Sequence, residues 1–423
     1  MLRLTALLLG VALLLTGSGL LGTLLAVRGG QEGFSPGTLG WVMSGYFAGY
    51  FIGTFTAPPL IRRIGHSRAF AFHAALATMA VLLHPLWIDP LGWIVLRVLT
   101  GVALVGLYTV IESWLNAEPD PRRRSRVFSL YMMVNLSALA LGQLLLLAGD
   151  AGAAAMFTVT ALLVCAAMLP VTATRLQQPE VPSVPRLTLG RLYALAPVAT
   201  VAAGLSGLAM GAFWGLLPVY AEQIGLRDAG VPLFMLTAIA GGALLQWPLG
   251  RISDGHDRRL GLLALSLLAA AVAGLAALPL LSQQLHLMFL LVFCYGGLVF
   301  ALYPFAVAHM LDYLPTPDLL SGCNSLLLVH GVGAAAGPAV ASALMQQFGA
   351  PALPLYFCSV LLVLAAFTAL RLRHARLRTH PATFRPMLRT TPAALELIPE
   401  PDSAPAAGDA PSPAPQPTPK EVH

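Results

Sequence analysis

The chain has 423 residues, of which 57% are hydrophobic and only 10% are charged. A soluble protein carries roughly 25% charged residues, so this composition excludes an ordinary globule in water and favours a membrane protein. The formal net charge of +6 does not indicate a nucleic-acid partner, because the basic residues lie between apolar runs.

Apolar runs of about 20 residues, the length that crosses a bilayer as a helix, recur along the chain. Their continuity favours helices over the alternating strands of a membrane β-barrel. The first run follows Arg3 like a signal peptide, but more apolar runs come after it, so we interpret it as the first span. The expected spans cover residues 4–27, 38–60, 68–88, 91–116, 126–148, 153–174, 193–218, 231–249, 259–281, 286–311, 322–344 and 352–371.

The positions of the basic residues support this division. With the N-terminus inside, 21 of the 24 basic residues fall on inner segments, Arg28 and Arg227 fall outside, and Arg97 lies within a span. Short inner loops of membrane proteins are enriched in arginine and lysine in this way. We therefore expect an inner-membrane protein with both termini in the cytoplasm.

The spans group into two halves. Residues 1–174 and 193–372 are each expected to form a six-helix bundle, joined by a proline-containing cytoplasmic linker at 175–192. Residues 373–423 are rich in proline and alanine and cannot bury a core, so we expect a disordered cytoplasmic tail.

An internal repeat supports the same division. Gly101–Tyr108 is similar to Gly296–Tyr303 at a spacing of 195 residues, and Leu60–Gly65 is similar to Gly250–Arg259 at a spacing near 192. Two spacings this close to each other indicate duplication of a six-span unit.

Two patterns resemble the major facilitator superfamily. That family has a loop with a carboxylate and arginines after the second span. Here Arg62–His66 carries Arg62 in place of the usual Asp, and the second copy, Gly250–Arg259, keeps Asp254. The fourth span has the family's Arg-x-x-x-Gly as Arg97–Gly101. The segment Glu112–Asn116 and the Ser-Asp-x-x-Asp-Arg-Arg string are similar to its YcaD-like bacterial subgroup.

The resemblance covers residues 4 to about 372. It implies an all-α membrane protein of twelve transmembrane helices in two pseudo-symmetric bundles, which rock about a site near the midplane. In the inner-loop motif, Asp254 with Arg258 or Arg259 is the candidate cytoplasmic latch, since such pairs can break and reform between states. The alternative is that these arginines only set the topology.

Ionisable residues inside spans are functional candidates because their burial is costly. Glu112 follows Arg97 by 15 residues on one helix, so the two lie ~22 Å apart and cannot pair. Glu112 is a candidate proton carrier; the alternative is a helix-end carboxylate near Arg122–Arg126. His309 lies at a similar depth in the second half and is a candidate gate, and mid-span His330 is a candidate proton relay.

Polar and aromatic residues on the spans that line the cavity of this family are candidates for solute contact. Asn135 and Gln143 lie about two turns apart on the fifth span and share a face. Arg97 is a candidate for binding an anionic group, with a structural hydrogen-bonding role as the alternative. The other cavity candidates, each also explicable by packing, are Tyr46, Tyr108, Trp214, Gln246 and Tyr303.

Motifs of soluble enzymes are missing from the sequence. There is no P-loop and no metal-spaced His/Cys cluster, so we expect no cofactor, no bound metal and no enzyme activity. The leading hypothesis is a monomeric secondary transporter in a lipid bilayer that exports a small organic solute by proton antiport. Uptake by symport, lipid translocation and a non-transporting receptor are the alternatives.

Overall fold

The computed structural model describes residues 2–117, 121–149, 154–174, 179, 187–227, 229–253, 257–282, 284–315 and 318–373. Over these residues, ten helices are long and apolar enough to cross a membrane. The second and third predicted spans are helices too, but they fall outside that group of ten, since the second is rich in glycine and tyrosine and the third is short and contains two histidines. Most of the predicted linker and nearly all of the predicted tail lie outside the described residues.

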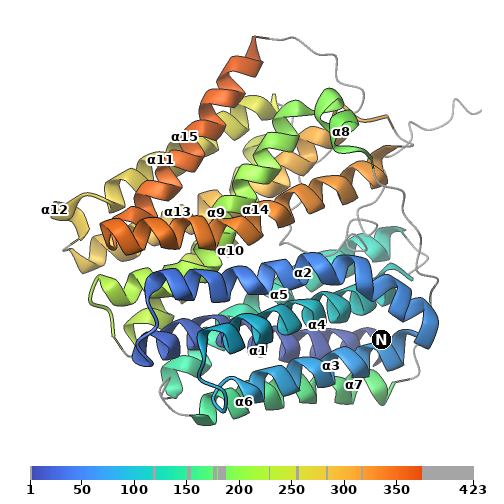
Figure 1. Ribbon diagram of the computed structural model, residues 1–423. Helices are drawn as coiled ribbons and strands as arrows, with labels where there is room; N and C mark the ends of the chain where they lie inside the picture. Colours follow the sequence, from blue (N-terminus) through green and yellow to red (C-terminus); the bar gives the residue numbers. More distant parts are fainter. Residues whose placement is uncertain are drawn as a thin grey trace, which may run out of the picture.

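The described residues of the first half form seven helices. They are drawn in blue to green in Figure 1. The sixth predicted span consists of two helices, α6 and α7, that follow each other directly. The seven helices are α1 (Leu2–Gln31), α2 (Pro36–Ile64), α3 (His66–Leu83), α4 (Pro90–Asn116), α5 (Pro121–Ala148), α6 (Ala154–Ala166) and α7 (Met168–Thr172).

In the second half, the residues that the structure describes form eight helices. The short α8 precedes the first span of this half, and the short α12 follows the third. The eight helices are α8 (Leu189–Leu195), α9 (Pro197–Gln223), α10 (Gly230–Ser253), α11 (Arg258–Ala276), α12 (Pro279–Ser282), α13 (Leu285–Leu311), α14 (Leu319–Phe348) and α15 (Ala352–Leu372).

Local sequence explains where several helices begin. The Ser35 hydroxyl accepts a hydrogen bond from the Thr38 amide at 3.2 Å, and the Asp89 carboxylate accepts one from the Gly92 amide at 2.8 Å. Each of these caps precedes a proline, Pro36 or Pro90, at the first helical position. Proline fits there because the amide hydrogen that it lacks has no partner within the helix.

The two halves pack their helices in the same pairs. In the first half α1 packs on α5 and α2 packs on α4; in the second half α9 packs on α14 and α10 packs on α13. A Cβ on Gly101 would overlap the carbonyl oxygen of Tyr46, and one on Gly296 would overlap that of Ala238. Glycines at the predicted repeat spacing therefore allow the same close helix crossing in both halves.

The halves meet most closely at one end of the molecule. We call the end that carries α8 and the start of α1 the linker end, and the opposite end, which carries the start of α2 and the end of α14, the far end. At the far end α2 and α14 touch across the halves, and a Cβ on Gly40 would overlap the Ser342 hydroxyl. Towards the linker end α2 and α14 diverge (Figure 1). The molecule is thus closed at its far end.

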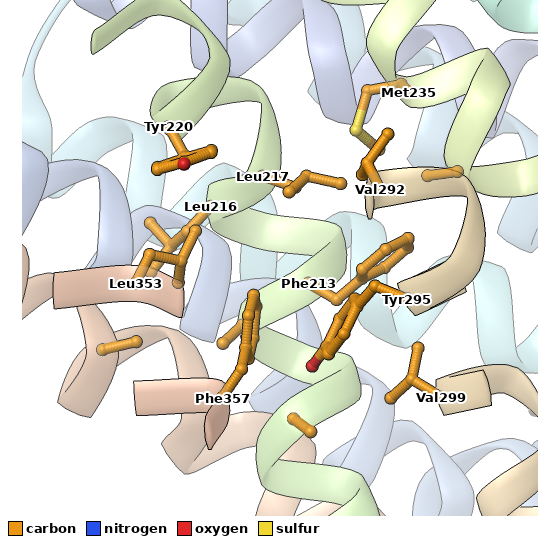
Figure 2. Close-up of a cluster of buried hydrophobic side chains, with 14 of the residues drawn as sticks. Phe213, Leu216, Leu217, Tyr220, Met235, Val292, Tyr295, Val299, Leu353 and Phe357 are labelled. Atoms are coloured by element: carbon orange, nitrogen blue, oxygen red, sulfur yellow. The ribbon is translucent and has the colours of Figure 1, made fainter. Parts of the chain in front are cut away.

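An apolar core in the second half packs against residues that border the space between the halves. Figure 2 shows Phe213 of α9 beside Tyr295 of α13, with Phe357 of α15 next to Tyr295. The rings of Tyr295 and Phe357 stack with centroids 4.9 Å apart. Phe213 also contacts the rings of Trp214 and Phe300, with centroids at 5.3 and 5.4 Å. These buried contacts fix the positions of Trp214 and Phe300.

Candidate functional site

A cavity lies between the two halves. Its empty volume is about 1150 Å³, including the part that is open to solvent. Four helices of each half contribute to its wall, namely α1, α2, α4 and α5 with α9, α10, α13 and α14. The structure brings together on this wall eight of the residues that the sequence singled out: Tyr46, Arg97, Tyr108, Asn135, Gln143, Trp214, Tyr303 and His330.

Three other predicted residues do not line the cavity. The Gln246 side chain is buried and donates a hydrogen bond to the Phe300 carbonyl oxygen at 3.3 Å, so it joins α10 to α13. Glu112 and His309 are buried towards the linker ends of α4 and α13.

Arg97 is the charged residue of the cavity wall. Its side chain is 6% exposed, and its guanidinium carbon lies 4.5 Å from the centre of the Tyr46 ring. Nη2 is 3.9 Å from the Met43 sulfur, and Nε has no hydrogen-bond partner among the described residues. The Arg97 guanidinium is therefore a buried cation that lies between α2 and α4 and borders the cavity.

The two amides of α5 differ in what they bind. Gln143 accepts a hydrogen bond from the Thr23 hydroxyl at 2.9 Å and donates one to the Gly19 carbonyl oxygen at 2.8 Å, so it joins α1 to α5. Asn135 donates to the Tyr131 carbonyl oxygen at 2.8 Å within its own helix. Gln143 therefore has a structural role, whereas the described residues of neighbouring helices form no such hydrogen bond with Asn135.

His330 occupies the position of α14 that corresponds to Asn135, since the two are separated by the same 195 residues as Gly101 and Gly296. Its Nδ1 lies 3.2 Å from the Ala203 carbonyl oxygen and 3.2 Å from the Ser206 hydroxyl. A carbonyl oxygen can only accept, so Nδ1 carries the hydrogen in this contact. The Nδ1–H group thereby orients the ring on the cavity wall.

Glu112 is fully buried and has a buried partner. The Tyr131 hydroxyl donates a hydrogen bond to its Oε1 at 2.8 Å, and both residues are 0% exposed. Glu112 lies one turn after Tyr108 on α4, and Tyr131 lies one turn before Asn135 on α5. One helical turn on each of two helices therefore separates the Glu112–Tyr131 pair from the cavity wall.

An ion pair lies at the linker end of the second half. Arg258 Nη1 is 2.8 Å from Asp312 Oδ1 and 2.8 Å from the Ala308 carbonyl oxygen, with both side chains 3% exposed. Arg259 pairs with its neighbour Asp257 at 2.7 Å. The predicted latch carboxylate, Asp254, lies outside the described residues, so its pairing stays a prediction.

His309 lies in the last turn of α13. Its side chain is 3% exposed, and its ring packs on that of Tyr313 with centroids 4.9 Å apart. The predicted pairing with Glu112 at a gate stays a prediction.

Sequence reasoning missed several residues of the site. Asp312 follows the tenth span, so charge placement alone could have suggested it as a partner for an inner arginine. Tyr131 is an aromatic residue of the fifth predicted span, and the sequence carries no sign of its hydrogen bond to Glu112. Apolar wall residues carry no signal that separates them from other span residues; they include Met43, Phe47, Met210, Met235 and Phe300.

Comparison with known proteins agrees with this architecture. The family model described as Major Facilitator Superfamily matches residues 7–226 and 199–407. The protein named "Uncharacterized MFS-type transporter YcaD" of Escherichia coli is 31% identical over 346 residues, which cover 80% of this chain and 88% of that protein.

Two solved structures have a similar fold. The nucleoside transporter NupG superposes with a TM-score of 0.73 at 13% identity, covering 89% of this chain and 100% of that one. A bacterial homologue of the human lysosomal transporter Spinster, in an inward-facing and occupied conformation, gives 0.72 at 14% identity, covering 90% and 98%. At these identities the likeness concerns the fold alone.

Two helical halves around a shared cavity, with apolar helices of spanning length, define a multi-pass membrane transporter. The match to the family model spans most of the chain, and the YcaD match covers four-fifths of it. The chain belongs to the Major Facilitator Superfamily, whose members are secondary transporters and not enzymes.

Proposed function

We propose that this transporter exports a small organic solute across the bacterial inner membrane by alternating access, in exchange for protons. The solute binds in the central cavity, and Glu112 carries the proton. The observation that carries this proposal is the buried Glu112–Tyr131 hydrogen bond, one helical turn from the cavity residues Tyr108 and Asn135.

A carboxylate is costly in a low-dielectric interior unless its charge is compensated. The Tyr131 hydroxyl supplies one hydrogen bond at 2.8 Å and can still donate to the carbonyl oxygen of a protonated carboxyl group. Glu112 can therefore hold or release a proton without losing this contact. Because Tyr108 and Glu112 share a face of α4, movement of a wall residue on solute binding would reach the proton site directly.

The shape of the molecule supports alternating access. The far end is closed by α2 and α14, where Gly40 and Ser342 touch, while these helices diverge towards the linker end. With the termini in the cytoplasm, as the arginine distribution predicts, this is an inward-facing state. Rocking of the halves would open the far end and close the linker end around the same cavity.

Two further elements have assigned roles in the proposal. Arg258 and Asp312 tie the start of α11 to the end of α13 at the inner surface, as part of the latch region predicted around Asp254. The His330 side chain lies on the cavity wall, and His309 lies near the inner mouth. Both histidines are therefore secondary candidates for proton transfer or gating.

Transport in proteoliposomes tests the proposal. A thermal-shift screen of metabolites and drugs, run from about pH 5.5 to 8 to span the ordinary titration range of histidine, supplies a ligand. We expect a pH gradient to drive this ligand across the membrane, and Glu112→Gln to abolish that movement while binding survives. The matched control is Glu32→Gln, which removes a partly exposed carboxylate paired with Arg28.

Unchanged gradient-driven transport in Glu112→Gln would remove Glu112 from the mechanism. Headgroup movement of labelled phospholipids, with no movement of any soluble ligand, would favour lipid translocation instead. Accumulation along the proton gradient, in the direction of proton flow, would favour uptake by symport.

A further inference from the structure

Arg97 has a positive charge that no carboxylate among the described residues neutralises. Its guanidinium is nine-tenths buried and lines the cavity. The ion pairs of the described residues join other arginines to carboxylates, and none includes Arg97. Aspartate and glutamate are missing from the part of the cavity wall that the described residues form.

The contacts that Arg97 does make are weak. The face of the Tyr46 ring lies 4.5 Å away, and a cation–π contact contributes about 0.5 to 2 kcal/mol. The Met43 sulfur at 3.9 Å is a poor acceptor. Desolvation of a buried ion costs several kcal/mol even after relaxation, so these contacts do not offset it. Water in the cavity, or a ligand, must provide the remaining acceptors.

None of the described ion pairs places a carboxylate at Arg97. Glu112 lies on the same helix about 22 Å away along its axis. Glu32 is engaged with Arg28 at the far end. An anion that reaches Arg97 therefore has to arrive through the cavity, and an ionised acid is the partner whose bidentate geometry fits a guanidinium best.

The remaining wall suits a flat, apolar body. Trp214 and Phe300 lie across the cavity from α4, on the other half, with ring centroids 5.6 Å apart and planes inclined by 37°. Met43, Met210 and Met235 add flexible thioethers that adapt to ligand shape. Planar rings are favoured on such aromatic and thioether surfaces.

We infer that the transported solute is an organic anion, with its acidic group held by Arg97 and an aromatic body against Trp214 and Phe300. This inference rests on the proposed function, since it names the class of solute for the same cavity. It assigns Arg97 a role in binding, separate from the proton site at Glu112.

Three ligands of the same shape test the inference: naphthoate, naphthamide and naphthylmethylammonium, which are an anion, a neutral amide and a cation. We expect naphthoate to bind the unaltered protein about tenfold or more tightly than naphthamide, because a hydrogen bond to a charged group is the stronger one. We expect naphthylmethylammonium to bind most weakly, since Arg97 repels it. Isothermal titration calorimetry at low salt measures all three, and this comparison requires no variant.

Variants locate the effect. Arg97→Gln should lower the affinity for naphthoate about tenfold to hundredfold and leave that for naphthamide nearly unchanged. Arg97→Lys, which keeps the charge but not the planar fork, should give an intermediate loss. The matched control is Arg251→Gln, which removes an arginine that stacks on Trp247 and does not line the cavity.

The inference is overturned if naphthamide binds as tightly as naphthoate, if none of the three binds, or if Arg97→Gln keeps full affinity for naphthoate. Transport and binding of the same ligands distinguish a failure of this inference from a failure of the proposed function. Glu112-dependent transport of naphthylmethylammonium but not of naphthoate would keep proton coupling and overturn the anion class. Arg97-dependent binding of naphthoate, with transport that is insensitive to Glu112→Gln, would do the reverse.

Discussion

The two halves of the molecule share their helix packing but differ in the polar residues that they bury. Glycines separated by 195 residues make equivalent close contacts: Gly101 and Gly296 against the second helix of their half, Gly142 and Gly337 against the first. At the same spacing, three buried polar residues of the first half have apolar counterparts in the second half. Arg97, Glu112 and Gln143 correspond to Val292, Val307 and Pro338.

At the linker end, the second half has the buried ion pair and the first half has a ring contact at the equivalent place. α11 begins at Arg258, whose guanidinium pairs with Asp312, whereas the equivalent α3 begins at His66, whose ring packs on Trp114 with centroids 5.8 Å apart. Duplication thus supplies a common scaffold, because helix packing depends on small residues at fixed positions. Arg97 and Glu112 have no ionisable counterpart in the second half, and in our proposal they bind the solute and carry the proton.

Breaking the buried Arg258–Asp312 ion pair of the second half should have the largest effect on stability. Asp312→Ala leaves Arg258 buried without its carboxylate, and removal of one partner from a buried pair costs about 3–5 kcal/mol. We expect a clear fall in the thermal unfolding temperature of the detergent-solubilised protein. Arg191→Gln is the control, because its pair with Asp318 is exposed on the arginine side and should be worth less than about 1 kcal/mol. Equal effects of the two variants would mean that Arg258–Asp312 is not a structural pair.

The shared scaffold is tested at the helix crossings. Gly101→Ala and Gly296→Ala each place a methyl group against a backbone carbonyl oxygen, so each should cost about 1–3 kcal/mol of unfolding free energy. Gly190→Ala, where no atom lies near the new methyl group, should be neutral. A large cost at one crossing and none at the other would show that the halves are not equivalent.

The smallest effect on stability concerns the Gln143 side chain, which has Pro338 as its counterpart in the second half. Gln143→Leu removes the bridge from α5 to Thr23 and Gly19, and the net loss of such a hydrogen bond is about 1 kcal/mol. Gln223→Leu, at the exposed end of α9, is the control. An unchanged unfolding temperature in Gln143→Leu would show that the Gln143 bridge does not stabilise the packing of α5 on α1.

Much of the fold could be predicted from the sequence. Apolar runs and arginine spacing gave the spans and the two halves because the bilayer forces each span to satisfy its own backbone hydrogen bonds. The repeat at 195 residues was visible in Gly101 and Gly296 and is matched by equivalent packing. The break between α6 and α7 and the short α8 and α12 were not predicted, since an apolar run has no clear boundary within it.

The candidate site could be predicted only in part. Arg97, Asn135 and His330 stood out because polar side chains are rare within spans. Gln246 has the same character, yet its amide turns towards the Phe300 carbonyl oxygen on α13. The direction in which a side chain points depends on the neighbouring helix, and a single sequence does not contain that information.

The sequence by itself determined that the chain lies in lipid, how many spans it has, and which ionisable residues are buried within those spans at an energetic cost. Composition and residue spacing decide these points because they set the hydrophobic length and the charge of each span. Only the tertiary structure decided which of those residues meet. Tyr131 reaches Glu112 and Asp312 reaches Arg258 through contacts between helices, while Arg97 is left facing a cavity that two distant parts of the chain enclose. Such partnerships arise from the crossing of helices, which the local sequence of each helix leaves open.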